Sequence, residues 1–101
     1  MRIKRDGETL RVSEIGELAA ASSGAFQSEL AVWLANRVSE IEIDLSQTGF
    51  LDCGGVGALV ALRKCARRRN SDVAIRLLNP TSSARRLFQL TRMDRVFPIE
   101  Q

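Results

Sequence analysis

The residues best placed to do chemistry occupy positions 49–57, Gly-Phe-Leu-Asp-Cys-Gly-Gly-Val-Gly, between a strand-like run and a helix-like run. A strand that turns directly into a helix leaves the first helical N–H groups unpaired and presents the positive end of the helix dipole. Such a junction attracts anions or the polar groups of a partner. Asp52 is a suitable N-cap, and Gly54 and Gly55 remove side chains that would keep another molecule from the backbone. The pattern also fits a simple capped helix, because it is not a phosphate-loop sequence.

Residue types that are missing exclude several kinds of site. The chain of 101 residues has no histidine, and its cysteines, Cys53 and Cys65, follow no zinc or disulfide pattern. We therefore expect no metal site, and neither a metalloenzyme nor a histidine-based hydrolase. No apolar stretch reaches the roughly 18 residues that a membrane span needs. We expect a cytoplasmic protein without membrane insertion.

Charge is unevenly distributed along the chain. Residues 1–50 hold five Lys/Arg and eight Asp/Glu, whereas residues 51–101 hold ten and four. Five of the later cations fall in the run 63–69, which is typical of a solvated helix end favoured by the helix dipole. Tyrosine is absent and other aromatic residues are few, so the interleaved aromatic side chains that stack on single-stranded bases are missing. We predict no direct binding of nucleic acid.

Hydrophobic patterning predicts the elements that position the junction. Alternation predicts a strand over 10–15, and we expect a shorter strand at 1–5 with a turn at Asp6-Gly7. A helix starting near Ser23 is predicted by the apolar stripe of Phe26, Leu30, Trp33, Leu34 and Val38. This stripe places Trp33 in the core or at its rim.

The remaining chain alternates strands with helices. We predict a strand over 41–45, a turn over 48–51, a helix over 53–70, a strand over 74–78 and a helix over 81–90. Pro80 suits the first turn of that last helix, and Pro98 marks the extended segment 95–99 as a sheet edge or tail. The order ββαβαβα indicates a single α/β domain over residues 1–101, with a mixed sheet of four to five strands covered by three helices. Sites in such sheets lie outside the carboxyl ends of strands, where Asp52 falls.

Several segments match one known pattern in the same order. Residues 16–18 are similar to a Gly-Glu-Leu-Asp segment, residues 43–46 to a central strand, and residues 50–57 to an aromatic–hydrophobic–Asp–Ser–Ser/Thr–Gly–Leu–Gly signature. Residues 78–80, residues 84–91 and Phe97 match the C-terminal third of the same pattern. Together they resemble the STAS domain, as found in anti-sigma-factor antagonists, over nearly the whole chain.

The resemblance implies a STAS fold and a protein-binding module of bacterial partner switching. It implies no enzyme, with no catalytic residues and no cofactor. In that family the unphosphorylated domain binds an anti-sigma factor with a kinase-like fold and so frees the sigma factor. The partner then phosphorylates the Ser or Thr after the signature Asp, and the added charge of about −1.5 to −2 disrupts the interface. The resemblance places the partner-binding surface at Asp52, Cys53, Gly54, Gly55 and Val56.

The chain departs from the family pattern where phosphorylation would occur. Cys53 stands at the phospho-acceptor position, and Gly54 stands at the following hydroxyl position. Ala19 replaces the Asp of the Gly-Glu-Leu-Asp segment. Ser46 and Thr48 lie nearby, but they precede Asp52 and do not match the family's site. The junction therefore offers a kinase no hydroxyl at the usual position.

Three interpretations of Cys53 follow. It is an inert small residue that leaves binding constitutive, or a redox-sensitive thiol activated by the helix N-terminus, or the partner is not a kinase. The last leads to an alternative function, a cytoplasmic STAS subunit bound to the ATPase of a phospholipid-type ABC transporter. Nucleotide binding by the chain itself is disfavoured, since a phosphate-loop lysine and a catalytic base are missing. We expect Cys53→Glu to weaken partner binding, and a bulky residue at Gly54 to block it with the fold intact.

Overall fold

A computed structural model describes residues 1–101 and contains two sheets and three α-helices. Its elements, in chain order, are β1 (Arg2–Asp6), β2 (Thr9–Ser13), β3 (Glu17–Leu18), α1 (Ser23–Trp33), β4 (Glu40–Asp44), β5 (Phe50–Leu51), α2 (Cys53–Arg69), β6 (Ala74–Leu78), α3 (Ser82–Leu90), the 3₁₀ helix η1 (Met93–Arg95) and β7 (Ile99–Glu100).

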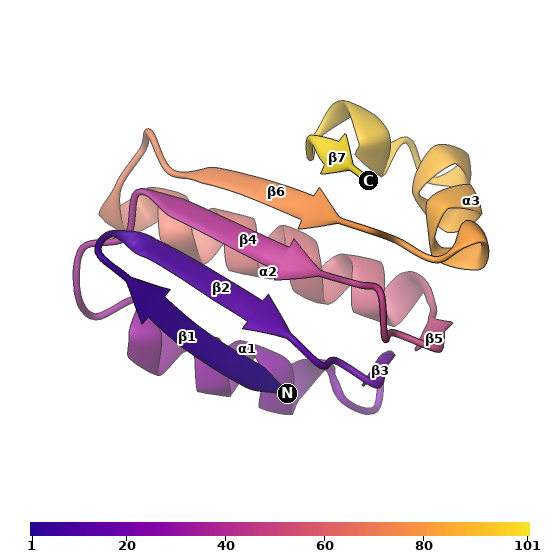
Figure 1. Cartoon of the computed structure of the whole chain (residues 1–101), viewed down its shortest axis with the longest axis horizontal. Helices are drawn as coiled ribbons and strands as arrows, with labels where there is room; N and C mark the ends of the chain where they lie inside the picture. The colour runs from indigo at the N-terminus through magenta and orange to yellow at the C-terminus, as the bar shows by residue number, and fades with distance from the viewer.

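The main sheet has five strands in the order β1-β2-β4-β6-β7 (Figure 1). β1 and β2 form an antiparallel hairpin, and β2, β4, β6 and β7 run parallel to one another. The turn of the hairpin contains Gly7 with φ of 63°, a left-handed conformation that favours glycine. The predicted fold class, a mixed sheet with three helices, is confirmed.

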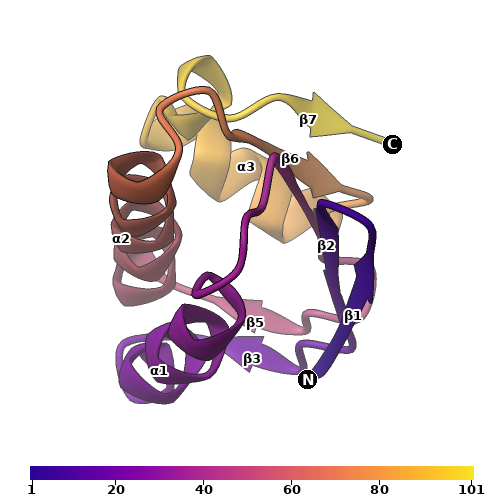
Figure 2. The ribbon, with the colours of Figure 1, turned by 90° about the vertical axis from the view of Figure 1, so that its left-hand side faces the viewer.

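All three helices lie on one side of this sheet (Figure 2). The strands turn their buried residues toward the helices, and the helices α1 and α2 return their own apolar faces to the same core. Side chains that are at most 2% exposed include Leu10, Leu30, Ile41, Ile43, Leu59, Leu62, Leu77 and Phe88. Trp33 is partly buried and packs against this core, as its place in the apolar stripe predicts.

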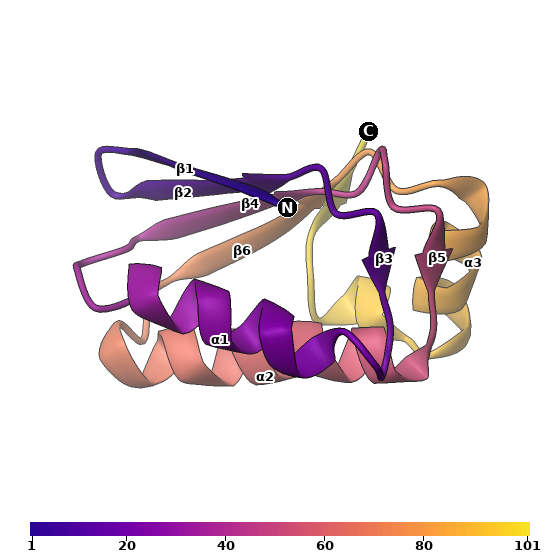
Figure 3. The ribbon, with the colours of Figure 1, turned by 90° about the horizontal axis from the view of Figure 1, so that it is seen from below.

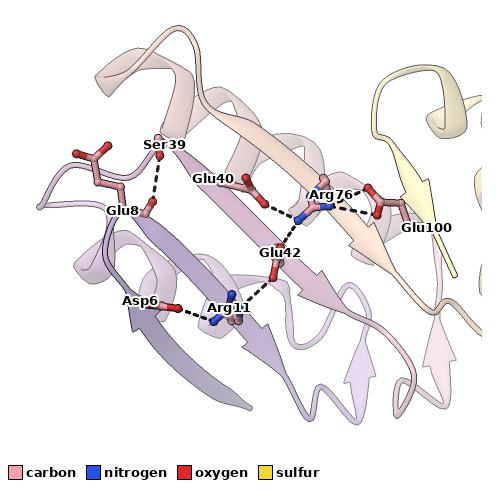
Figure 4. Close-up of polar contacts among 8 residues, drawn as sticks. All are labelled: Asp6, Glu8, Arg11, Ser39, Glu40, Glu42, Arg76 and Glu100. Carbon is pink, nitrogen blue, oxygen red and sulfur yellow. Dashed lines mark hydrogen bonds and ion pairs between the residues drawn. The ribbon is translucent and has the colours of Figure 1, made fainter.

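The opposite face of the sheet is open and carries charged side chains (Figure 4). A ladder of ion pairs, which crosses all five strands, consists of Asp6, Arg11, Glu40, Glu42, Arg76 and Glu100. Arg11 donates to Glu42 at 3.0 Å and to Asp6 at 3.0 Å, and Arg76 donates to Glu100 at 3.1 Å and also to Glu42. Because these charges pair with one another, the open face needs no covering helix.

Glu42 occupies the middle of this ladder, with its carboxylate shared between two arginines. Burial by itself would raise the pKa of Glu42, but the hydrogen bond from Arg11 and the charge of Arg76 hold that pKa below its ordinary value. The pKa of Arg76 is raised, chiefly by its hydrogen bond to Glu100. The ladder therefore favours the charged forms of its members.

Several predicted boundaries differ from those observed. α1 ends at Trp33, so Val38 belongs to the loop before β4, although its side chain is only 5% exposed. The loop brings Val38 back to the core, which made the helical stripe look longer than it is. The predicted strand over 10–15 ends at Ser13, because Glu14 adopts a left-handed conformation with φ of 55°.

The C-terminal predictions also need correction. α3 begins at Ser82, with Thr81 as the N-cap accepting from the N–H of Ala84 at 3.2 Å, so Pro80 precedes the cap. The segment predicted as extended over 95–99 instead contains the end of η1 and the start of β7. β7 pairs with β6 at the edge of the sheet directly after Pro98, which confirms the interpretation of that proline as an edge marker.

Candidate functional site

A second, two-stranded sheet holds the start of α2 in place. β3 and β5 pair in parallel, with Glu17 opposite Phe50 and Leu18 opposite Leu51. The N–H of Gly49 donates to the carbonyl of Gly16 at 3.0 Å and extends this pairing by one bond. Figure 3 shows β3, β5 and α3 side by side at the end of the molecule where α2 begins. The turn predicted over 48–51 thus contains a strand.

Asp52 joins this small sheet to α2. Its Oδ1 accepts from the N–H of Gly55 at 3.0 Å, which confirms Asp52 as the N-cap, and also from the N–H of Ala20 at 3.2 Å. The N–H of Asp52 donates to the carbonyl of Leu18 at 3.4 Å. One carboxylate oxygen therefore satisfies the first turn of α2 and the loop after β3 together.

Gly54 and Gly55 face β3 and the loop that follows it. A Cβ on Gly54 would lie 2.5 Å from Cα of Ala20, and a Cβ on Gly55 would lie 1.9 Å from the carbonyl oxygen of Leu18. Both glycines therefore allow α2 to pack closely against β3 and the loop that follows it. The expectation that a bulky residue at Gly54 leaves the fold intact is wrong, because that side chain would have to displace backbone. Val56 is also buried, at 6% exposed.

Besides Gly49, the accessible residues of the junction are Phe50, Cys53 and Gly57. Phe50 is 53% exposed, Cys53 is exposed, and a Cβ on Gly57 would meet nothing within 4 Å. We call these residues the α2 entry surface. Cys53 and Gly57 are one helical turn apart, and Phe50 alternates with the inward-facing Leu51, so helical and strand periodicity could have found them. Phe50 and Gly57 belong to the 50–57 signature, but the partner-binding surface was predicted at residues 52–56 and so left them out.

The entry surface also presents backbone donors. The N–H groups of Cys53 and Gly54 precede the first helical hydrogen bond, which Val56 donates to the carbonyl of Asp52 at 3.0 Å, and so belong to the donors that a helix start leaves unpaired. They lie at the N-terminal end of α2, where the helix dipole is positive. The surface therefore combines an exposed aromatic ring, a thiol and unpaired donors, which suits contact with another molecule.

No hydroxyl is placed as the family signature would require. Thr48 is 1% exposed, and its Oγ1 has no hydrogen-bond partner. Ser46 is exposed, but it follows β4 and lies before β5. A serine or threonine at position 54 would bring its Cβ onto Ala20, so glycine is required there by packing. Ala19, which replaces the family's Asp, is 4% exposed.

The family is established by comparison with known proteins. A family model described as "Mlab, STAS domain" matches residues 1–99. The chain belongs to the STAS domain family. Among curated relatives, this STAS protein is 25% identical over 97 residues to an anti-sigma-B factor antagonist of Listeria monocytogenes, a match covering 96% of this chain and 83% of the relative.

Solved structures show the same fold. A proposed anti-sigma factor antagonist of Thermotoga maritima matches with a TM-score of 0.88 at 21% identity, covering 99% of this chain and 85% of that one. The anti-sigma factor antagonist SpoIIAA in its unphosphorylated form matches with a TM-score of 0.79 at 17% identity, covering 99% and 87%. The TM-scores show that the chain shares the fold of these proteins.

The structure shows neither a membrane-spanning helix nor a metal-binding cluster in this chain. None of its helices combines the length and the apolar character that crossing a membrane demands. No group of three or more His, Cys, Asp or Glu side chains is arranged to hold a metal ion.

Proposed function

We propose that this STAS domain is an anti-sigma-factor antagonist, a binding module that acts by occupying an anti-sigma factor and so releasing a sigma factor. The observation that carries the proposal is the α2 entry surface, where Cys53 stands exposed at the position of the family's phospho-acceptor. The antagonists among its relatives and the match of fold support it. We assign the contact to Phe50, Cys53 and Gly57, with Asp52, Gly54, Gly55 and Val56 shaping the surface from behind.

Binding at this surface depends on close approach. The thiol of Cys53 is small and uncharged in its neutral form, and Gly57 adds no side chain, so a partner can reach the unpaired N–H groups of α2. Phe50 supplies apolar area at the edge of the contact. A carboxylate at position 53 would bring charge into the interface and would have to be desolvated, which weakens association.

Regulation in this chain differs from a serine or threonine switch. A kinase-like partner finds no hydroxyl at Cys53 or Gly54, so the antagonist binds constitutively unless the thiol itself is modified. Nothing in the geometry of Cys53 beyond its exposure favours oxidation, and the inert interpretation is the simpler one. We therefore propose constitutive binding in the cytoplasm of a bacterium.

The missing hydroxyl also favours a second candidate. A STAS subunit that binds the ATPase of a phospholipid-type ABC transporter needs no phospho-acceptor, and the absence of one at residues 53 and 54 is natural in that role. Both candidates use the same α2 entry surface, so they differ in partner and not in site.

Affinity capture decides between the two candidates. The tagged protein is used as bait in extract of its native cell, beside a Cys53→Glu bait, and bound proteins are identified by mass spectrometry. We expect a kinase-like anti-sigma factor on the first bait and its loss from the second. Capture of an ABC ATPase with the same dependence on position 53 would establish the transporter role. A partner retained equally by both baits would remove the α2 entry surface from the interface.

A further inference from the structure

Unpaired basic charge and exposed apolar side chains coincide on α3 and the turn that follows it. The exposed residues there include three arginines and two aliphatic residues, which we call the α3–η1 surface: Arg86, Leu90, Arg92, Arg95 and Val96. Ser82, Ser83, Gln89 and Asp94 are exposed beside them. Leu90 is 70% exposed and Val96 is 36% exposed. They are two of the five large apolar residues that the protein exposes, and they lie within seven positions of each other.

The segment is compact, so these residues form one local surface. Arg86 and Leu90 are four positions apart on α3 and share one side of the helix. After the helix, Arg92 adopts a left-handed conformation with φ of 60° and reverses the chain. The N–H groups of Arg95 and Val96 then bond to the carbonyls of Arg92 and Met93 at 3.2 and 3.0 Å. The N–H of Arg92 bonds to the carbonyl of Gln89 at 3.2 Å, which joins the turn to the end of α3.

The arginines of this surface have no acidic partner within the protein. Every ion pair of the chain uses Arg2, Arg11, Arg37 or Arg76. None uses an arginine of α3 or η1. Asp94 lies between Arg92 and Arg95 in sequence but pairs with neither. Arg85, next to Arg86, has a buried Nη2 without a hydrogen-bond partner. Positive charge is thus left available beside exposed aliphatic side chains.

We propose that the α3–η1 surface binds an acidic protein segment that carries an apolar side chain. Carboxylates of the partner would pair with Arg86, Arg92 and Arg95, and the apolar side chain would cover Leu90. Nucleic acid would bind the arginines but would not cover the exposed aliphatic side chains, and the surface has no aromatic ring for base stacking. Two aliphatic side chains are too few for the continuous apolar face with which a helix enters a lipid surface. This inference is independent of the proposed function.

The basic run at the end of α2 serves as an internal comparison. Arg67 donates to the carbonyl of Ser71 at 3.1 Å and so ties the end of that helix to the loop after it. No large exposed apolar residue accompanies Arg68. Arg68 is exposed and makes no ion pair, as Arg86 does not. The two arginines therefore match in charge and exposure, and they differ in the apolar neighbours that the proposal requires.

The test uses a fluorescein-labelled peptide of glutamate and leucine, with an all-glutamate peptide of the same charge for comparison. Fluorescence anisotropy at moderate salt measures its affinity for the full chain and for Arg86→Glu, Leu90→Ser and Arg68→Glu variants. We expect Arg86→Glu and Leu90→Ser each to weaken binding about fivefold or more, and Arg68→Glu to change it less than about twofold. Amide shift changes in NMR spectra should concentrate over residues 86–96, and unchanged spectra elsewhere show that each variant folds.

Other outcomes overturn the inference. Equal weakening by Arg68→Glu and Arg86→Glu, or equal affinity for the two peptides, would mean that net charge alone attracts the probe. No binding of either peptide would also contradict it. Vesicles of phosphatidylglycerol and a DNA duplex are tested in parallel, and binding of either one in place of the peptide would assign the surface to lipid or nucleic acid.

Discussion

At the scale of single residues, Asp52 caps α2 and also holds the loop after β3. Its Oδ1 accepts from Gly55 and from Ala20, so it ties α2 to the loop after β3. We predict that Asp52→Ala lowers the free energy of unfolding by about 1–2 kcal/mol, because a cap is lost and a second N–H is left unpaired. Asp52→Asn keeps an acceptor oxygen and should lose less. Urea unfolding measures the stability of both variants. An Asp52→Ala variant as stable as the wild type would contradict a stabilising role for the two hydrogen bonds that Asp52 accepts.

The glycines of α2 give a matched pair at the same scale. Gly55→Ala places a Cβ 1.9 Å from the carbonyl oxygen of Leu18, so we predict destabilisation of about 1–3 kcal/mol. Gly57→Ala meets nothing within 4 Å and replaces glycine in a helix, so it should stabilise the protein by about 0.5–1 kcal/mol. The two variants are compared by thermal and urea unfolding. Changes of the same sign would show that α2 does not pack on β3 as described.

At the scale of elements, the open face of the sheet should make stability depend on pH. Because the folded-state pKa of Glu42 lies below its ordinary value, its ionised form stabilises the fold above that value, and this contribution is lost as the pH falls through the lower folded-state pKa. We predict that Glu42→Gln lowers stability near pH 7 and flattens the decline toward about pH 4. Glu29→Gln is the control, because Glu29 is exposed on α1 and belongs to none of the ion pairs. Parallel pH profiles for wild type and Glu42→Gln would refute the role of the ladder.

The elements also show what the sequence could and could not predict. β4, α2 and β6 were predictable because each carries its periodic pattern over a full element and ends at a recognisable cap or turn. β3 and β5 were not, since two residues each are too few for alternation and their pairing is non-local. The helix was predicted too long because Val38 is buried in the loop at a position that also continues the apolar spacing of the helix. Gly54 and Gly55 were correctly singled out, but only the position of β3 shows that they serve packing.

At the scale of the whole molecule, the small sheet and α3 place the start of α2 at one end of the protein, away from the ladder on the open face. Phe50 lies at that end and is 53% exposed. We predict that Phe50→Ala weakens partner binding about fivefold or more while leaving stability within about 0.5 kcal/mol. Val32→Ala, which truncates a residue that is 74% exposed on α1, should leave binding unchanged. Calorimetric titration with the captured partner compares them, and equal affinities would exclude Phe50 from the interface.

The central claim is that the exposed start of α2 binds an anti-sigma factor. Its most direct test is calorimetric titration of the organism's kinase-like anti-sigma factor with wild type, Cys53→Ser and Cys53→Glu. We predict tight binding by wild type and by Cys53→Ser, which keeps the size of the side chain, and at least about tenfold weaker binding by Cys53→Glu. Equal affinity for all three proteins, or no binding by the wild type, would contradict the claim.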